Sequence, residues 1–204
     1  MKNGGFFKER IFPILFMLII TVVCIAIVSS IHLSTKELVE LNETLFLKRA
    51  VIFAANIPAG ETTAEIVQAF ENRVEEVKDG EGATRYFRVV EEGSGDVRGY
   101  VVFQNGAGLW GEIEAVVGYQ EDLKTLTGVD FIKQNETPGL GARITEAWFR
   151  EQFRGKTGPF TMVPEGTVSS TSEFDAITGA TRTSTAVLKM MNASVANVAS
   201  IVGE

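Results

Sequence analysis

The chain has 204 residues, enough for one domain with a sizeable hydrophobic core and further segments outside it. Its formal net charge of −7 and the lack of a basic stripe argue against a nucleic-acid-binding protein. One cysteine and one histidine are too few for a disulfide framework, a protein-held zinc or iron–sulfur site, or a c-type haem. We therefore predict no metal site, and any redox chemistry would require an organic cofactor.

The first predicted element is a membrane-spanning helix at residues 11–32. This stretch contains no Lys, Arg, Asp or Glu, and it meets the length of about 20 residues that crossing a bilayer takes. It is longer than the apolar region of a signal peptide, and no small-residue cleavage site follows it, so we expect the helix to be retained. Three basic residues lie within residues 1–10, whereas two glutamates accompany Lys36 on the other side. The positive-inside rule then predicts a cytoplasmic N-terminus, with the rest of the chain outside.

Two more helices are expected before any strand. Residues 35–55 carry leucines at helical spacing and are expected to continue the membrane helix as a stalk, which a Pro-Ala-Gly sequence interrupts. A second amphipathic helix is predicted over about residues 62–77. We accordingly expect a helical stalk and connection at residues 33–60 and an extracytoplasmic domain at residues 61–204.

The middle of the chain has the pattern of an antiparallel sheet, because short runs of aromatic and β-branched residues alternate with Gly-rich turns. The predicted strands are 85–90, 99–103, 113–119, 126–133 and 160–163. A short helix at 144–153 is expected to turn Trp148, Phe149 and Phe153 toward the core. This order of elements predicts an α+β domain rather than a doubly wound sheet.

A closing amphipathic helix is predicted to begin between Thr181 and Ser184, because apolar residues recur at three- and four-residue spacing from Ala186 onward. Hydroxyl side chains cap such a helix, and its free N–H groups and positive dipole end suit a phosphate. Gly179 and Ala180 would let that phosphate approach the backbone. On these features alone, an ordinary capped helix is equally consistent with the sequence.

Two Gly-rich loops, at residues 105–111 and 136–141, also need an explanation. Such turns between strands mostly supply backbone conformations with positive φ. A Leu or Trp held at the first loop can also form an apolar wall for a flat ring, and Glu136 or Thr137 can bond the ring's polar edge. Both interpretations stay open at this point.

Three stretches together carry a family resemblance. They are Asn105-Gly-Ala-Gly-Leu-Trp-Gly111, Glu136-Thr-Pro-Gly-Leu-Gly141 and Asp175-Ala-Ile-Thr-Gly-Ala-Thr181. In this order they resemble the membrane-anchored FMN-binding domain family, which includes the G subunit of the Rnf electron-transport complex and the C subunit of the sodium-translocating NADH:quinone reductase. The resemblance covers the membrane helix and essentially the whole domain. One departure is Asn135, where relatives often carry His or another polar residue.

The most specific part of the resemblance is Asp-x-x-(Ser/Thr)-Gly-Ala-Thr, which a flavin transferase reads in that family. It implies FMN attached through a phosphoester to Thr181, with Asp175 recognised by the transferase and no catalytic residue. The residues then expected around the phosphate are Thr178, Gly179, Ala180, Thr183 and Ser184. Those expected around the flavin ring are Leu109, Trp110, Glu136, Thr137, Pro138, Gly139 and Leu140.

The resemblance also implies a function. It indicates an electron-relay subunit of an Rnf-type ion-translocating ferredoxin:NAD oxidoreductase in the inner (cytoplasmic) membrane, with the FMN domain on the periplasmic side. Its partners would be the other subunits and, during maturation, the flavin transferase, and it would turn over no substrate of its own. The alternatives are the equivalent subunit of a sodium-translocating NADH:quinone reductase and a membrane-tethered assembly or ligand-binding module without redox turnover. The compact chain favours the Rnf-type complex, and the intact motif around Thr181 argues against the non-redox alternative.

Overall fold

The computed structural model describes residues 10–203, so most of the predicted cytoplasmic segment 1–10 lies outside the described residues. The chain divides into two units, Met1–Thr44 and Leu45–Glu204. A single helix, α2 (Phe12–Ala54), begins in the first unit and ends in the second. The predicted membrane helix and the predicted stalk are therefore one continuous helix.

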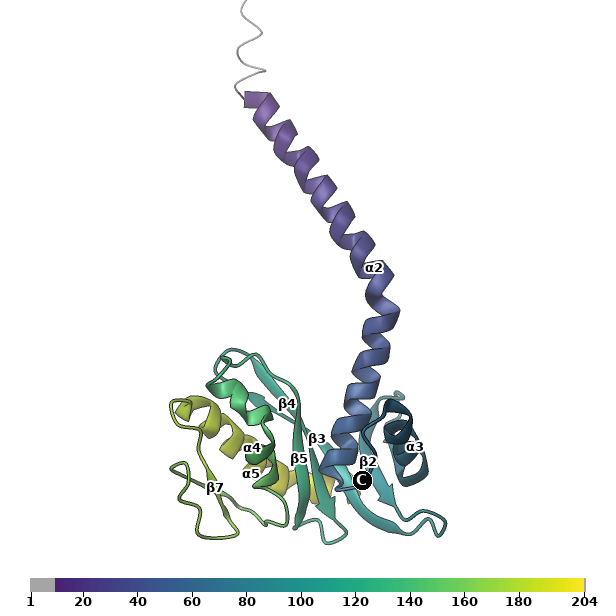
Figure 1. The fold of residues 1–204 in the computed structure, drawn as a ribbon, viewed down its shortest axis with the longest axis vertical. Coiled ribbons are helices and arrows are strands. Elements are labelled where there is room, and N and C mark those ends of the chain that lie inside the picture. The colour runs from purple at the N-terminus through teal and green to yellow at the C-terminus, as the bar shows by residue number, and fades with distance from the viewer. Residues whose placement is uncertain (1–9, 204) are drawn as a thin grey trace, which may run out of the picture. The chain divides into compact units, whose positions relative to one another are not determined.

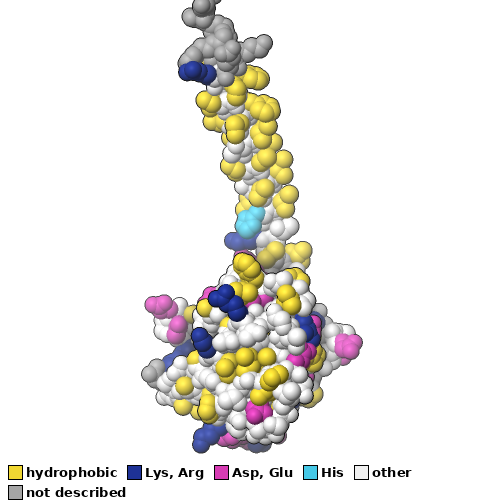
Figure 2. Space-filling model, turned by 90° about the vertical axis from the view of Figure 1, so that its left-hand side faces the viewer, with side chains coloured by type: hydrophobic (Ala, Val, Ile, Leu, Met, Phe, Trp, Pro, Cys, Tyr) yellow, Lys and Arg dark blue, Asp and Glu magenta, His cyan; other side chains and the backbone are white. Residues whose placement is uncertain are grey.

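The first unit carries the apolar stretch predicted to span a membrane. Large hydrophobic side chains along residues 11–33 are exposed, and apolar side chains cover the visible face of this part of the helix (Figure 2). Within residues 10–203, α2 and α5 (Thr181–Gly203) are the two helices long and apolar enough to cross a membrane. The apolar window of α5 is partly buried in the second unit, whereas that of α2 is wholly unburied. These properties support a membrane anchor in α2.

The second unit is built on a five-stranded antiparallel sheet with strand order β1-β2-β3-β4-β5 (Figure 1). Its strands are β1 (Val74–Lys78), β2 (Thr84–Val90), β3 (Val97–Ala107), β4 (Glu112–Gln120) and β5 (Leu126–Lys133). The other helices are α3 (Thr63–Arg73), the 3-10 helix η2 (Gly141–Thr145), α4 (Ala147–Glu151) and α5. The predicted α+β class is confirmed, and strands β2 to β5 contain the four predicted strands.

Both faces of the sheet are covered by helices, which gives the unit three layers (Figure 1). On one face, α5, η2 and α4 contribute the buried residues Val187, Ile144 and Phe149. On the other face, the last turns of α2 and the helix α3 contribute Val51 and Phe70. The last ten residues of α2 therefore belong to the second unit and supply part of its core.

Strand β3 shows why the sequence folds into this three-layer arrangement. Successive side chains of a strand point to opposite faces of the sheet. Val101 belongs to the cluster on the α2 side and Val102 to the cluster on the α5 side, and both are fully buried. A strand that is apolar at adjacent positions needs cover on both faces, which the helices provide.

The structure corrects the prediction of the second helix. Helix α3 ends at Arg73 rather than near Val77, because the next five residues form β1 and pair with β2, with Val74 opposite Val89. Phe70 and Val74 stand four residues apart, so this stretch also fits a helical pattern. Pairing with β2 makes this stretch a strand, because tertiary contacts outweigh the local preference of these residues for a helix or a strand.

Smaller differences affect the region around the predicted motifs. The helix expected at residues 144–153 is divided between η2 and α4; Phe149 and Phe153 are buried as predicted, whereas Trp148 is only partly buried. The strand expected at residues 160–163 is β6 (Thr161–Val163). It pairs in parallel with β7 (Glu173–Asp175), which was not predicted. The closing helix begins at Thr181, within the predicted interval.

An ion pair between buried Asp130 and half-buried Arg150 joins the sheet to α4. Arg150 Nη1 lies 2.7 Å from Asp130 Oδ2, and the Arg150 guanidinium stacks on the Phe53 ring at 4.2 Å from its centroid. Burial raises the pKa of the Asp130 carboxyl, and the hydrogen bond and charge of Arg150 oppose that rise. Asp130 therefore depends on Arg150 to stay buried as a charged group.

We predict that Arg150→Met lowers the free energy of unfolding by about 3–5 kcal/mol, because it leaves Asp130 buried without its partner. The measurement is denaturant unfolding of the full chain in detergent, followed by tryptophan fluorescence. Arg98→Met is the matched control, since its pair with Glu91 is exposed and is expected to contribute less than about 1 kcal/mol. Equal losses for the two variants would contradict the prediction.

Candidate cofactor site

The three motifs identified in the sequence meet at one cavity in the second unit. The cavity has a volume of about 230 Å³. Its lining residues are Leu109, Glu136, Thr137, Leu140, Gly141, Gly179, Ala180, Thr181, Arg182 and Thr183. The first motif forms the end of the β3–β4 hairpin, the second follows β5, and the third leads into α5. Segments far apart in the sequence therefore form one concave site.

Glu136 holds the three motifs together. Its side chain is almost fully buried, at 5% exposure. Oε1 accepts hydrogen bonds from the backbone N–H groups of Leu109 at 2.8 Å and Trp110 at 3.1 Å, and Oε2 accepts one from the Thr183 hydroxyl. Hydrogen bonds to an ionised group contribute more than neutral ones, about 1.5–3 kcal/mol each. The carboxylate thus fastens the hairpin end and the start of α5 to the loop between them.

Two glycines make room for this carboxylate. A Cβ atom on Gly108 would lie 2.6 Å from Glu136 Oε1, and one on Gly141 would lie 2.8 Å from Oε2 and 2.5 Å from Thr183 Oγ1. Neither glycine has a positive φ. The sequence suggested turn geometry as the usual reason for glycines in these loops, but these two positions exclude a side chain because the carboxylate lies against the backbone.

The third motif ends in a turn that leads into the first residue of α5. Gly179 has φ of +80°, a conformation that glycine adopts without strain. The Ala180 N–H bonds the Ile177 carbonyl, and the first bond of the helix runs from Ser184 N to Ala180 O. Backbone N–H groups in the first turn of a helix have no partner within it, and they point toward whatever lies at its end. The exposed Thr181 therefore stands where such donors converge on the cavity.

Two hydroxyls expected near a phosphate have partners inside the protein in this structure. Thr183 is 1% exposed and donates to Glu136. Ser184 is fully buried, accepts a hydrogen bond from Ile177 N at 3.0 Å and donates to Ala180 O at 3.1 Å. Both hydroxyls stabilise the turn before α5, and their contact with a phosphate stays a prediction.

The large apolar residues predicted to lie along a flavin ring, Leu109, Trp110 and Leu140, are exposed. Leu109 and Leu140 line the cavity, with exposures of 41% and 43%. Trp110 is 67% exposed, and its indole Nε1 donates to the Thr137 hydroxyl at 3.2 Å. Pro138 and Gly139 lie between the lining residues Thr137 and Leu140 in the sequence and are exposed, but they do not themselves line the cavity.

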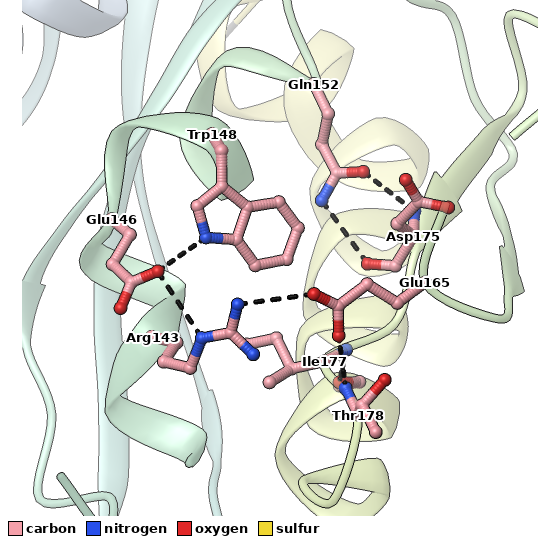
Figure 3. A network of polar contacts seen from close by, with 9 residues as sticks. Arg143, Glu146, Trp148, Gln152, Glu165, Asp175, Ile177 and Thr178 are labelled. Atoms are coloured by element: carbon pink, nitrogen blue, oxygen red, sulfur yellow. Dashed lines mark hydrogen bonds and ion pairs between the residues drawn. The ribbon is translucent and has the colours of Figure 1, made fainter. Parts of the chain in front are cut away.

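Asp175, at the end of β7, is held by neighbouring loops. Its Oδ1 accepts hydrogen bonds from the backbone N–H groups of Thr167 at 3.0 Å and Val168 at 3.2 Å. The Gln152 side chain bonds both the N–H and the carbonyl of Asp175, at 2.7 and 3.3 Å (Figure 3). The position of Asp175 is thus fixed by contacts on both its backbone and its side chain.

A second set of contacts, which the sequence did not reveal, supports the third motif. Glu165 accepts a hydrogen bond from Thr178 N at 2.8 Å and pairs with Arg143 at 3.2 Å (Figure 3). Arg143 also pairs with Glu146 and stacks on the Trp148 ring at 5.1 Å. Two contacts lower the pKa of the Glu165 carboxyl. Hydrogen bonding from Thr178 has the larger effect, and the contact with Arg143 adds to it. No local pattern marks Glu165 or Arg143, so only the folded structure shows their role.

Comparison with known proteins identifies relatives of this chain. Residues 108–196 match the family model of the FMN-binding domain, so the resemblance that the three motifs indicated is confirmed. The G subunit of an ion-translocating oxidoreductase complex of Methanosarcina acetivorans is 38% identical over 120 residues, which are 57% of this chain and 60% of the relative. The G subunit of a Na⁺-translocating ferredoxin:NAD⁺ oxidoreductase complex of Acetobacterium woodii is 38% identical over 109 residues, which are 52% of each chain. The chain therefore spans little more than half the length of these relatives.

A solved structure shares the fold. The C subunit of the Na⁺-translocating NADH-quinone reductase of Parabacteroides distasonis superposes with a TM-score of 0.67 and 24% sequence identity. The match covers 83% of this chain and 97% of the other. At this level of identity, the similarity shows that the two chains fold alike.

We predict that Glu136 and Thr183 act as one unit in holding the site together. Glu136→Ala removes three hydrogen bonds and should lower the free energy of unfolding by more than about 2 kcal/mol. Thr183→Val should also destabilise, and the double variant should lose about 0.5–3 kcal/mol less than the sum of the single losses. Denaturant unfolding of the four proteins gives this coupling energy.

The control for this cycle is Glu112→Ala, because Glu112 is exposed on β4 and accepts a hydrogen bond from the side chain of Asn105 on the neighbouring strand. It should change the free energy of unfolding by about 0.5 kcal/mol or less. Strictly additive losses for Glu136 and Thr183 would show that the contact between them contributes nothing.

Proposed function

We propose that this protein is an electron-relay subunit of an Rnf-type ion-translocating ferredoxin:NAD oxidoreductase, and that it carries FMN as a phosphoester on Thr181. The observation that carries the proposal is the position of Thr181. This exposed hydroxyl residue opens α5 and lines a cavity to which all three motifs contribute. The names of the two relatives from Methanosarcina acetivorans and Acetobacterium woodii support the choice of complex.

The start of α5 is suited to the phosphate of FMN. An ester at Thr181 Oγ1 would place the phosphate oxygens beside the free N–H groups and the positive dipole end of the helix. Gly179 and Ala180 leave space next to the backbone, and Arg182 adds a positive charge at the cavity. An anionic group at this place is therefore stabilised by both partial and full positive charges.

The cavity is suited to one part of a flavin ring. Its 230 Å³ is below the roughly 300–1,000 Å³ typical of pockets that enclose a ligand. Leu109, Trp110 and Leu140 would cover an apolar ring face, while another edge of the ring stays accessible. Bound FMN supplies reversible uptake and release of electrons, one or two at a time. An accessible edge fits a protein that receives electrons from one partner and passes them to another.

The remaining assignments concern maturation and location. Asp175 would be read by a flavin transferase, and the other partners would be subunits of the same membrane complex. Residues 11–32 would cross the inner membrane with residues 1–10 in the cytoplasm, which places the folded domain on the periplasmic side. The unburied apolar part of α2 and the basic residues before it support this orientation.

A second candidate is the equivalent subunit of a sodium-translocating NADH:quinone reductase. The observation that favours it is the fold shared with the C subunit of that enzyme from Parabacteroides distasonis. Both candidates require the same cofactor chemistry at Thr181. Co-purification of the neighbouring subunits from native membranes distinguishes them, because an iron–sulfur-rich, ferredoxin-type partner would indicate the Rnf-type complex.

We predict that Thr181→Ala abolishes covalent flavin while the domain stays folded, because the change removes one exposed hydroxyl. The measurement is peptide mass spectrometry on protein purified from native membranes under denaturing conditions, together with in-gel flavin fluorescence. Wild-type protein should carry an adduct of roughly FMN minus water on the peptide that contains Thr181. Thr181→Ser should retain partial labelling, since its hydroxyl remains.

Thr185→Ala is the matched control, because Thr185 lies one helical turn further along α5 and its hydroxyl bonds the Thr181 carbonyl. This variant and Thr183→Ala should both be labelled. Fluorescence that survives in Thr181→Ala would refute the attachment site. Unlabelled wild-type protein, in cells shown to contain the transferase, would instead support a non-redox assembly or ligand-binding module.

A further inference from the structure

Two side chains of opposite charge line the cavity, and they differ in burial. Glu136 is 5% exposed, whereas Arg182 is exposed to solvent. A charge at the surface is screened by water and salt, whereas a buried charge acts through a medium of lower dielectric constant. Of the two, Glu136 therefore has the stronger effect on a molecule bound in the cavity.

The position of Glu136 is fixed by its hydrogen bonds and by the backbone packed around it. Its three partners are the N–H groups of Leu109 and Trp110 and the hydroxyl of Thr183, and all of them donate. An ionised carboxylate is a pure acceptor, so these partners suit the charged form. The backbone at Gly108 and Gly141 closes around the carboxylate, which keeps it in the cavity wall.

We propose that Glu136 lowers the reduction potential of the flavin in this cavity through its buried negative charge. The inference rests on the proposed function. Both carboxylate oxygens already have protein partners, so Glu136 would hold the site in position and act on the flavin's potential through its charge. Bound FMN would become one unit more negative on taking up two electrons from a reduced donor protein and one proton from solvent. Repulsion by Glu136 raises the free energy of that state and so disfavours reduction.

The positive charges at the site act in the opposite direction. Arg182 and the N-terminus of α5 favour a more negative ring. Arg182 is exposed to solvent, and a phosphate on Thr181 would offset both positive charges. Glu136 belongs to the second motif, among the residues predicted to contact the ring. Its hydrogen-bond partners Leu109, Trp110 and Thr183 carry no full positive charge.

The substitution Glu136→Gln separates charge from shape. The amide oxygen of glutamine can accept both hydrogen bonds from the hairpin end, and its NH₂ group can donate to the Thr183 hydroxyl. The variant should therefore keep the geometry of the site, with an unfolding midpoint above that of Glu136→Ala, although neutral hydrogen bonds replace stronger ones. Its loss of one negative charge should appear in the flavin's potential.

The test is a spectroelectrochemical titration of the flavin-loaded full chain in detergent. Glu136→Gln should raise the midpoint potential by at least about 30 mV, which is a tenfold change in the equilibrium of a two-electron couple. Arg182→Gln should lower it by a smaller amount. The control Glu121→Gln should leave it unchanged, because Glu121 follows the end of β4 that is farthest from the cavity. An unchanged or lowered potential in Glu136→Gln would overturn the inference, as would an equal shift in the control.

The same samples distinguish this inference from the proposed function. A missing flavin adduct on wild-type Thr181 would defeat the proposed function and remove the basis of the inference. A labelled protein whose potential ignores Glu136 would defeat the inference alone. Should Glu136→Gln fail to fold, Arg182→Glu is the substitute, because it adds a negative charge to the same cavity. A lowered midpoint potential would support the inference that charges in the cavity wall set the potential of the flavin. An unchanged potential would refute it.

Discussion

The carboxylate of Glu136 is the contact on which the arrangement of the site depends. Its three hydrogen bonds join a hairpin end, a loop and the start of a helix. Because the carboxylate is buried, these bonds take the place of hydrogen bonds to water. The backbone at Gly108 and Gly141 lies so close to this carboxylate that neither position has room for a side chain. A buried charged group with both of its oxygens in use is costly to remove, and a side chain that cannot make the same hydrogen bonds cannot replace it.

The sheet provides the fixed frame around that contact. Helices cover both of its faces, so the hairpin end and the loop after β5 extend from strands that cannot shift without disturbing two hydrophobic clusters. Helix α5 packs along the same sheet and presents Thr181 at its first turn. A site assembled from the ends of packed elements keeps its geometry better than one built from loops alone.

The sequence allowed much of this to be predicted where the signal was local. Runs of aromatic and β-branched residues between Gly-rich turns marked strands β2 to β5, and the cluster of hydroxyl and small residues marked the start of α5 within a few positions. Strand β1 was missed because Val74 fits a helical and an extended pattern equally well, and only its partner in β2 decides. Glu165 was missed because its bond to Thr178 N spans 13 residues and follows no repeat. Contacts of this kind arise from the fold as a whole.

The end of α2 has a practical consequence for the study of this domain apart from its membrane. Ala50, Val51 and Ala54 are completely buried and pack against the sheet, although they precede the Pro-Ala-Gly break that marks the apparent domain border in the sequence. A truncation at that border would remove the α2 part of the hydrophobic layer on one face of the sheet and leave the contribution of α3 in place. A soluble fragment suited to crystallography or NMR spectroscopy must retain the chain from Leu45 onward.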